Sequence, residues 1–362
     1  MFKEFDPLQD KIFRITDNAG KIINQKWKPE LSDEQIRSAW RDMLFVRTAD
    51  IMAVSFQRQG RMFTYPPGYG QEAISVALGQ VMKQEDWLVP AFREMGAWLA
   101  KGASLKDIFM YYMGYEEGTA FRNAPKLLPV AVPIASQLLH AVGIGYSIRL
   151  KKENDIVFTV VGDGGTSTGD FHEALNFAAV WKVPVVFVIQ NNQFAISVPV
   201  RSQTASLNLA VKSVAYGMPG IKVDGNDYLA MYKALEEASA YARGGSGPVL
   251  IEALTYRRGA HTTSDDPTRY RTQEEEEKWA ETDPLARIRA YLASKKMIAE
   301  GEEEMLTEQY REEVERAFGE AENHGPYQLE DVFRYTYVEM PEDLKLQQLN
   351  YEKFLKWKEA RS

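Results

Sequence analysis

Two short polar segments follow two successive apolar runs of the chain. Asp163 lies in the turn GDGGTSTGD (162–170), directly after IVFTVV, and Asn191 and Asn192 follow VPVVFVIQ. Because open α/β sheets bind ligands at the carboxyl ends of their strands, we expect these oxygens to meet at one sheet edge. Mg²⁺ takes few protein oxygens and fills its octahedron with water and phosphates. The pair predicts a magnesium site, although each segment alone is more typical of a polar turn.

The glycine-rich turn does not match the two common nucleotide loops. A dinucleotide fingerprint starting at Gly162 needs a third glycine where the chain has Ser167. A phosphate loop ending at Gly169 needs lysine and then serine or threonine, but Asp170 and Phe171 follow. We therefore interpret Asp163 as a ligand of a hard cation, with the flanking glycines allowing close backbone approach.

The elements that must position these residues follow from the hydrophobic pattern. Short β-rich runs separated by helical patterns predict a doubly wound parallel sheet of the α/β class, covered by helices on both faces. The predicted strands are 156–161, 183–190, 220–225 and 248–256.

Helical patterns surround these runs. Ser32 and Gln35 form a capping box for a helix that ends near Gln59, before Gly60. After the turn, Asp170 is the expected cap of the next helix. Further helices are predicted near 71–82, 92–101, 104–114 and 136–150.

Three parts of the chain are expected. Residues 1–30 look like an irregular N-terminal arm, 31–272 form the α/β domain, and 273–362 form a charge-rich helical extension. Acidic runs such as QEEEEKWAE are typical of solvated helix faces.

Composition excludes several classes of protein. The net charge of −8 argues against a nucleic-acid binder, which needs a basic face. The chain has no cysteine, so disulfides and thiolate chemistry are excluded. No stretch has the ~20 apolar residues of a membrane span, and the N-terminus lacks a signal pattern, so we expect a cytoplasmic protein without membrane contact.

The segment GDGGTSTGDFHEALNFAAVWKVPVVFVIQNN resembles the thiamine diphosphate motif, in which GDG is followed by NN. More closely, the chain is similar to alpha subunits of the dehydrogenase component of 2-oxoacid dehydrogenase complexes. The similarity covers nearly the whole chain, in the correct order: PELSDEQ, RQGR, YGQEA, FRE, PIASQ, VDGND and HTTSDDPTRYR.

This resemblance implies that Asp163 and Asn192 bind Mg²⁺ through their side chains and that Phe194 binds it through its carbonyl. Gly164 and Gly165 would let backbone amides approach the cofactor diphosphate.

The resemblance also implies roles for residues outside the turn. Arg93 would pair with the diphosphate, a contact for which guanidinium is well suited. Phe92 stands beside it where relatives often have tyrosine, and Ile134 would line the cofactor site. His261 would be the active-site histidine, and Arg257 would bind phosphate or steady its loop.

Pro133, Ser136 and Gln137 match positions that bind potassium in some relatives. Thr168 stands where relatives usually carry glutamine or glutamate, and the sequence gives no physical account of it.

The expected activity is decarboxylation of a 2-oxoacid with reductive acylation of a lipoyl group. Pyruvate is the favoured substrate, and a branched-chain 2-oxoacid is the alternative. The expected partners are a beta subunit, in an α2β2 heterotetramer, and the lipoyl-bearing dihydrolipoamide acetyltransferase core. An alternative of another class is a non-catalytic scaffold, against which the presence of Asp163, Asn192, Arg93 and His261 speaks.

Overall fold

A computed structural model describes residues 1–361. The chain forms two compact units, of which the first is Met1–Phe318 and the second begins at Gly319. The division lies inside a helix. The boundaries expected from the sequence, after residues 30 and 272, stay a prediction.

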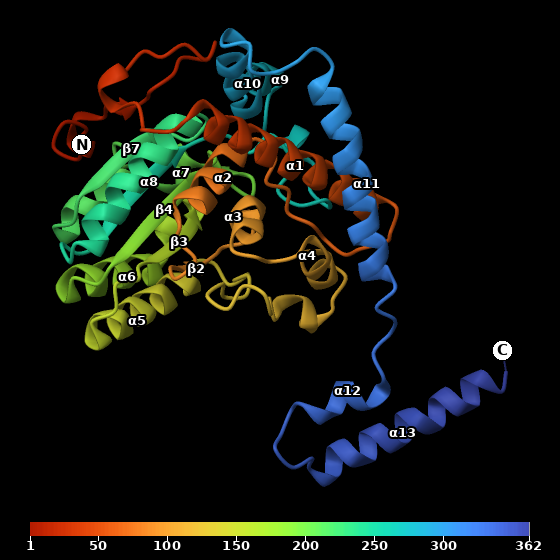
Figure 1. Cartoon of the computed structure of the whole chain (residues 1–362). Coiled ribbons are helices and arrows are strands. Elements are labelled where there is room, and N and C mark those ends of the chain that lie inside the picture. Colours follow the sequence, from red (N-terminus) through yellow and green to blue (C-terminus); the bar gives the residue numbers. More distant parts are fainter. Residues whose placement is uncertain (362) are drawn as a thin grey trace. The chain divides into compact units, whose positions relative to one another are not determined.

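The first unit is built on a six-stranded sheet in which every pairing is parallel, with the strand order β1-β7-β8-β4-β3-β2 (Figure 1). A small antiparallel hairpin, β5-β6, follows β4. The strands are β1 (Ile12–Phe13), β2 (Trp87–Val89), β3 (Val157–Gly162), β4 (Val185–Asn191), β5 (Phe194–Ala195), β6 (Val198–Pro199), β7 (Gly220–Asp224) and β8 (Val249–Leu254).

Helices α5 and α6 cover one face of the sheet, and α2 and α8 cover the other (Figure 1). The doubly wound α/β prediction is therefore confirmed. The helices of the first unit are α1 (Asp33–Arg58), α2 (Glu72–Val81), α3 (Met95–Ala100), α4 (Leu105–Tyr112), α5 (Ser136–Lys151), α6 (Gly169–Trp181), α7 (Val200–Gln203), α8 (Tyr228–Arg243), α9 (Gln273–Ala280) and α10 (Pro284–Ser294). Helix α11 (Glu302–Glu322) crosses the division between the units.

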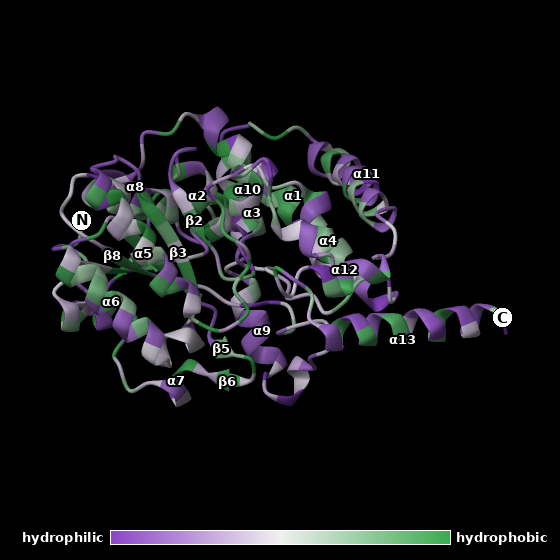
Figure 2. Ribbon diagram, turned by 90° about the horizontal axis from the view of Figure 1, so that it is seen from below, coloured by the Kyte–Doolittle hydropathy of each residue, from purple (hydrophilic) through white to green (hydrophobic). Residues whose placement is uncertain are grey.

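The four predicted strands are all present, and they are the buried ones. Every residue of β4 is buried, which explains why its sequence is a continuous apolar run instead of an alternating one. Figure 2 shows the hydrophobic colour along β3, whose side chains pack with α5 and α6 in one core. The carboxyl ends of β3 and β4 therefore lie side by side, with Gly162 opposite Gln190.

The expectation of an irregular arm at residues 1–30 is wrong in one respect. Ile12 and Phe13 pair with Lys222 and Val223 and add the edge strand β1 to the sheet. Two residues are too short to show a strand period, so only the tertiary pairing identifies this strand. Strand β2 has only three residues, which is also too short to show a strand pattern, and it was likewise not predicted.

Helix α1 begins and ends as its sequence predicts. Ser32 Oγ accepts from the Gln35 amide at 3.2 Å, and Gln35 Oε1 accepts from the Ser32 amide at 2.8 Å. Gly60 follows the last turn with a φ of +76°, a conformation that favours glycine at this position.

The second unit consists of the end of α11 with α12 (Leu329–Arg334) and α13 (Glu342–Glu359), and α12 packs against α13. Neither α12 nor α13 has a fully buried residue within the described part of the chain. No helix among residues 1–361 combines the length and the apolar character that a membrane span requires.

Candidate functional site

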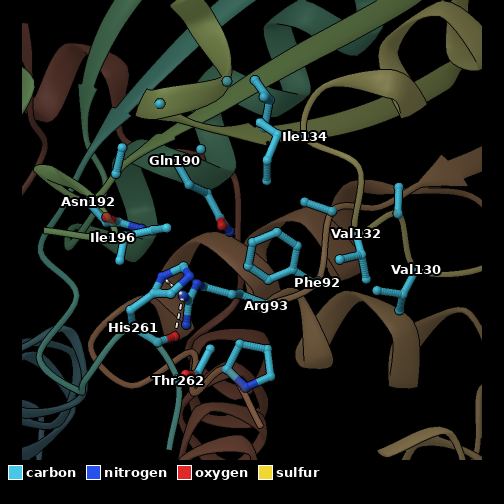
Figure 3. A pocket seen from close by; sticks show the side chains of 18 of the residues that line it. Phe92, Arg93, Val130, Val132, Ile134, Gln190, Asn192, Ile196, His261 and Thr262 are labelled. Carbon is cyan, nitrogen blue, oxygen red and sulfur yellow. Dashed lines mark hydrogen bonds between the residues drawn. The ribbon is translucent and has the colours of Figure 1, made fainter. Parts of the chain in front are cut away.

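A cavity of about 760 Å³ opens at the carboxyl ends of β3 and β4. This volume is in the range of sites for cofactors and other small molecules. The residues expected to bind Mg²⁺ or thiamine diphosphate all line this cavity: Phe92, Arg93, Ile134, Asp163, Gly164, Gly165, Asn192, Phe194, Arg257 and His261. Figure 3 shows how part of this set faces the same space.

Asp163 follows the last residue of β3 and is only 2% exposed. Its Oδ2 accepts a hydrogen bond from Gln203 Nε2 at 3.0 Å. Burial raises the pKa of the Asp163 carboxyl, and the bond from Gln203 opposes that shift. A buried carboxylate with so little neutralisation is costly by itself. A bound cation would remove that cost.

Asn192 and Phe194 continue from β4 toward the same end of the cavity. Asn192 Nδ2 donates to Gln71 Oε1 at 3.4 Å, and Asn192 Oδ1 accepts from the Phe194 amide at 3.4 Å. The amide oxygen is therefore the atom of this side chain that could bind a cation. The Phe194 carbonyl accepts from Arg257 Nη1 at 3.1 Å. A carbonyl has two lone pairs, so this bond leaves one acceptor site on the oxygen.

The glycines of the turn are required by packing. A Cβ on Gly164 would lie 2.5 Å from the Ala195 Cβ, and one on Gly165 would lie 2.3 Å from Val161 Cγ2. Ile134, which is half exposed, also approaches Gly165, with its Cγ2 3.3 Å from the position of the added Cβ. Any larger residue would push the turn out of place.

Arg93 and His261 lie side by side at the cavity (Figure 3). Arg93 Nη2 donates to His261 Nδ1 at 3.1 Å and to the His261 carbonyl at 2.7 Å. Its other terminal nitrogen, Nη1, donates to the Pro67 carbonyl at 2.5 Å. The guanidinium also lies over the Phe92 ring, 5.2 Å from its centre.

The surroundings of His261 favour a neutral imidazole. Burial lowers its pKa to about 4, and the positive charges of Arg93 and Arg257 act in the same direction against the opposing effect of Asp265. Because Nδ1 accepts from a guanidinium, the ring hydrogen belongs on Nε2. His261 therefore presents an N–H donor without a charge.

Arg257 is fully buried and stabilises the segment that carries His261. Besides the Phe194 carbonyl, its Nη2 donates to the Ile196 carbonyl at 2.7 Å and to the Tyr270 hydroxyl at 3.1 Å. The Tyr270 hydroxyl in turn donates to Asp265, which also accepts from the His261 amide at 2.7 Å. The hydrogen bonds of Arg257 therefore favour the role of fixing the loop.

Of the three residues matched to a potassium site, Gln137 alone lines the cavity. Gln137 Nε2 donates to the Val160 carbonyl at 2.7 Å, while its buried Oε1 has no partner in the described structure. Ser136 Oγ donates to the Pro133 carbonyl at 2.9 Å.

Sequence reasoning missed Gln190 and Gln203. Gln190 ends the predicted strand, and Figure 3 shows its side chain pointing into the cavity between Asn192 and Phe92. Its buried Nε2 has no hydrogen-bond partner among the described residues. Gln190 directly precedes Asn191, and this position at the strand end could have indicated it as a site residue. Gln203 lies on α7, far along the chain, and no motif indicates its contact with Asp163.

The expected cap of α6 was wrong, and its correction explains Thr168. Thr168, not Asp170, precedes the helix: Thr168 Oγ1 accepts from the Phe171 amide at 3.4 Å and donates to the Gly165 carbonyl at 2.8 Å. Asp170 lies inside the first turn instead. Threonine is a preferred N-cap residue, which gives Thr168 a physical role.

The donor set fits a metal that is shared with a ligand. Among residues 1–361, no cluster of three or more acidic or histidine side chains could hold a metal alone. One carboxylate, one amide oxygen and one carbonyl leave the remaining positions of an octahedron to water and phosphate oxygens. The unpaired Gln190 and Gln137 atoms likewise suit a polar ligand.

Comparison with known proteins gives consistent similarities. The family model described as "Dehydrogenase E1 component" matches residues 40–330. The chain is 45% identical to the pyruvate dehydrogenase E1 component subunit alpha of Acholeplasma laidlawii, over 94% of this chain and 99% of that protein. It is 38% identical to the same subunit of Staphylococcus aureus, over 92% and 90%. It is also 42% identical to the 3-methyl-2-oxobutanoate dehydrogenase subunit alpha of Mycobacterium tuberculosis, over 89% and 88%.

Proposed function

The chain belongs to the dehydrogenase E1 component family, and we propose that it is the alpha subunit of a pyruvate dehydrogenase. In this proposal it takes part in the thiamine diphosphate-dependent oxidative decarboxylation of pyruvate and the reductive acetylation of a lipoyl group on the acetyltransferase. Relatives named for pyruvate dehydrogenase span nearly the whole chain and support this choice of substrate. The cytoplasmic location expected from the sequence is part of the proposal.

One observation carries the proposal. A single cavity is lined both by the oxygen donors Asp163 and Asn192 and by the guanidinium of Arg93 with the neutral His261. A ligand with a metal-bound diphosphate needs both kinds of group, since the metal requires oxygen ligands and the phosphates are well matched by a guanidinium. This combination supports a thiamine diphosphate site with Mg²⁺.

Different residues would bind different parts of the cofactor. Asp163, Asn192 and the Phe194 carbonyl would hold Mg²⁺, and Arg93 would pair with the diphosphate. Gln190 Nε2, which is buried without a partner, adds a donor on the cavity wall. Gln137 Oε1 supports K⁺ binding next to Ser136 and Pro133, because a buried oxygen without a donor is an acceptor for a cation.

Bound thiamine diphosphate supplies an electron sink for decarboxylation of the 2-oxoacid. The chain contributes position and electrostatics. Arg93 is anchored by the Pro67 and His261 carbonyls, so its charge is fixed before a ligand arrives. His261 can donate from Nε2 to an oxygen of substrate or lipoyl-bound product without bringing a second charge.

The proposal includes a beta subunit in an α2β2 heterotetramer and a lipoyl-bearing acetyltransferase core. Several apolar side chains at the cavity are exposed in the single chain, namely Phe63 (69%), Val132 (62%), Ile196 (56%) and Ile134 (50%). Exposed apolar surface of this kind is typical of a protein interface and supports a partner chain over the cavity.

Two other functions are considered, and one of them has specific support. The similarity to a 3-methyl-2-oxobutanoate dehydrogenase alpha subunit favours a branched-chain 2-oxoacid as the second candidate substrate. A non-catalytic scaffold is the candidate of another class, and the complete set of cavity residues speaks against it.

Co-expression with the beta subunit tests all three functions. The purified complex, supplied with thiamine diphosphate and Mg²⁺, should release carbon dioxide from pyruvate faster than from 3-methyl-2-oxobutanoate. Faster release from the branched acid would reverse the substrate assignment. Cofactor binding without release from either acid would leave the scaffold function.

A further inference from the structure

The segment Tyr65–Gly68 lies between helix α1 and the loop that carries His261. Thr263, two residues after His261, forms two hydrogen bonds with this segment. The Tyr65 amide donates to Thr263 Oγ1 at 3.2 Å, and the Thr263 amide donates to the Tyr65 carbonyl at 3.0 Å. We call residues 65–68 the Tyr65 segment. The position of the His261 loop thus depends on that of the Tyr65 segment.

The Tyr65 segment also holds Arg93. The Pro67 carbonyl accepts from Arg93 Nη1 at 2.5 Å. The Gly68 backbone approaches that of Arg93 so closely that a Cβ on Gly68 would lie 2.9 Å from the Arg93 carbonyl oxygen. Both members of the Arg93–His261 pair are therefore fixed to the same four residues.

Asp50 of α1 is what fixes the Tyr65 segment in turn. Asp50 Oδ1 accepts from the Tyr65 hydroxyl at 2.7 Å and from the Gly68 amide at 3.0 Å. The side chain is buried, and its second oxygen, Oδ2, has no hydrogen-bond partner in the described structure. A buried, half-paired carboxylate is costly for stability, so a role beyond stability is a reasonable expectation.

We propose that Asp50 is a positioning residue of the site, acting through the Tyr65 segment on Arg93 and on the His261 loop. Asp50 does not line the cavity, so its effect is indirect. The consequence for cofactor affinity and turnover rests on the proposed function. The consequence for loop order does not, because it follows from the hydrogen bonds alone.

Tyr65→Phe is the most informative variant. It removes only the hydroxyl and keeps the ring, which packs edge-on against Tyr112 with ring centres 4.8 Å apart. Asp50→Leu removes both acceptors at similar size. If Asp50→Leu fails to fold, Tyr65→Phe and Thr263→Val still test the two ends of the chain of contacts. Asp42→Asn is the matched control, because Asp42 also lies on α1 and accepts one bond, from Gln80, away from the cavity.

Amide hydrogen exchange in the α/β complex should distinguish positioning from general destabilisation. We expect Tyr65→Phe to increase exchange in residues 257–271 about fivefold, the effect of losing one buried hydrogen bond, while residues 157–191 of the central strands are unchanged. An equal increase in both regions would mean a purely structural role. Unchanged exchange in residues 257–271 would overturn the proposal.

Cofactor titration separates this inference from the proposed function. We expect the dissociation constant for thiamine diphosphate with Mg²⁺ to rise about fivefold in Tyr65→Phe and to stay at the wild-type value in Asp42→Asn. Wild-type affinity in Tyr65→Phe would contradict the inference. Absence of binding to the wild-type complex would instead contradict the proposed function, and the exchange data would still decide the role of Asp50.

Discussion

Arg93 Nη2 lies 3.1 Å from His261 Nδ1 and 2.7 Å from the carbonyl of the same residue. One guanidinium nitrogen thereby fixes both the ring and the backbone of the histidine. Because a guanidinium is only a donor, the contact determines the tautomer and keeps the imidazole neutral. The loop histidine predicted from the sequence is thus an oriented donor at Nε2 and is poorly suited to act as a base through Nδ1.

The first prediction concerns the protonation of His261. Its pKa should be about 4, and Arg93→Gln should raise it because a neighbouring positive charge is lost. The four histidines of the chain make an NMR titration of the ring signals practical, with His261→Gln as the assignment control. A wild-type His261 that titrates near 6.5 would contradict the geometry described here.

The same depressed pKa predicts a pH dependence of stability. Below about pH 6.5 the histidine is protonated in the unfolded chain, whereas in the folded protein it stays neutral until about pH 4. The unfolding free energy should therefore fall as the pH is lowered through this window. His261→Gln should flatten that part of the melting-temperature profile, and equal slopes for both proteins would refute the prediction.

His261→Ala should impair acyl transfer to the lipoyl group more than it impairs cofactor binding. We expect about a hundredfold loss of transfer, in the range of lost hydrogen-bond or proton-transfer catalysis, with little change in thiamine diphosphate affinity. Thr268→Ala is the control, because Thr268 lies in the same loop and its hydroxyl donates to the exposed Asp266. Wild-type transfer by His261→Ala would remove His261 from the site.

Asp163→Ala should abolish Mg²⁺-dependent cofactor binding to the α/β complex. The substitution removes the only carboxylate among the three proposed ligands, and with it the acceptor of Gln203. Calorimetry with and without Mg²⁺ measures the effect. Asp170→Ala, seven residues along in the first turn of α6, should bind normally; loss of binding in both variants would point to damage of the turn and not to metal ligation.

How much the sequence could predict depends on the range of the interactions. Strands β3 and β4 were predictable because burial on both faces leaves a nearly continuous apolar run. Strands β7 and β8 were predicted as well, although Lys222 and Glu252 interrupt their apolar residues. Strand β1 was not, since Ile12 and Phe13 owe their conformation to pairing with residues 222–223. The placement of Asp163 and Asn192 at one cavity was likewise predictable, because each of them directly follows a strand.

The contacts between distant segments could not be read from the sequence. Gln203 reaches Asp163 across 40 residues, and the Tyr65 amide reaches Thr263 across 198. The prediction of the α6 cap was wrong for a local reason. Thr168 and Asp170 are both good cap residues, and the backbone of the turn places Thr168 at the cap position. The position of the cap depends on the packing around Gly164 and Gly165, which the spacing of residues in the sequence does not predict.

Thr168→Val should therefore cost about 1 kcal/mol of unfolding free energy, the usual value of an N-cap hydroxyl. Valine has the same shape, so the change isolates the loss of the bonds to Phe171 and Gly165. Urea unfolding measures it, with the neighbouring, exposed Ser167→Ala as a control within about 0.5 kcal/mol of wild type. A larger cost for Asp170→Ala than for Thr168→Val would restore Asp170 as the cap.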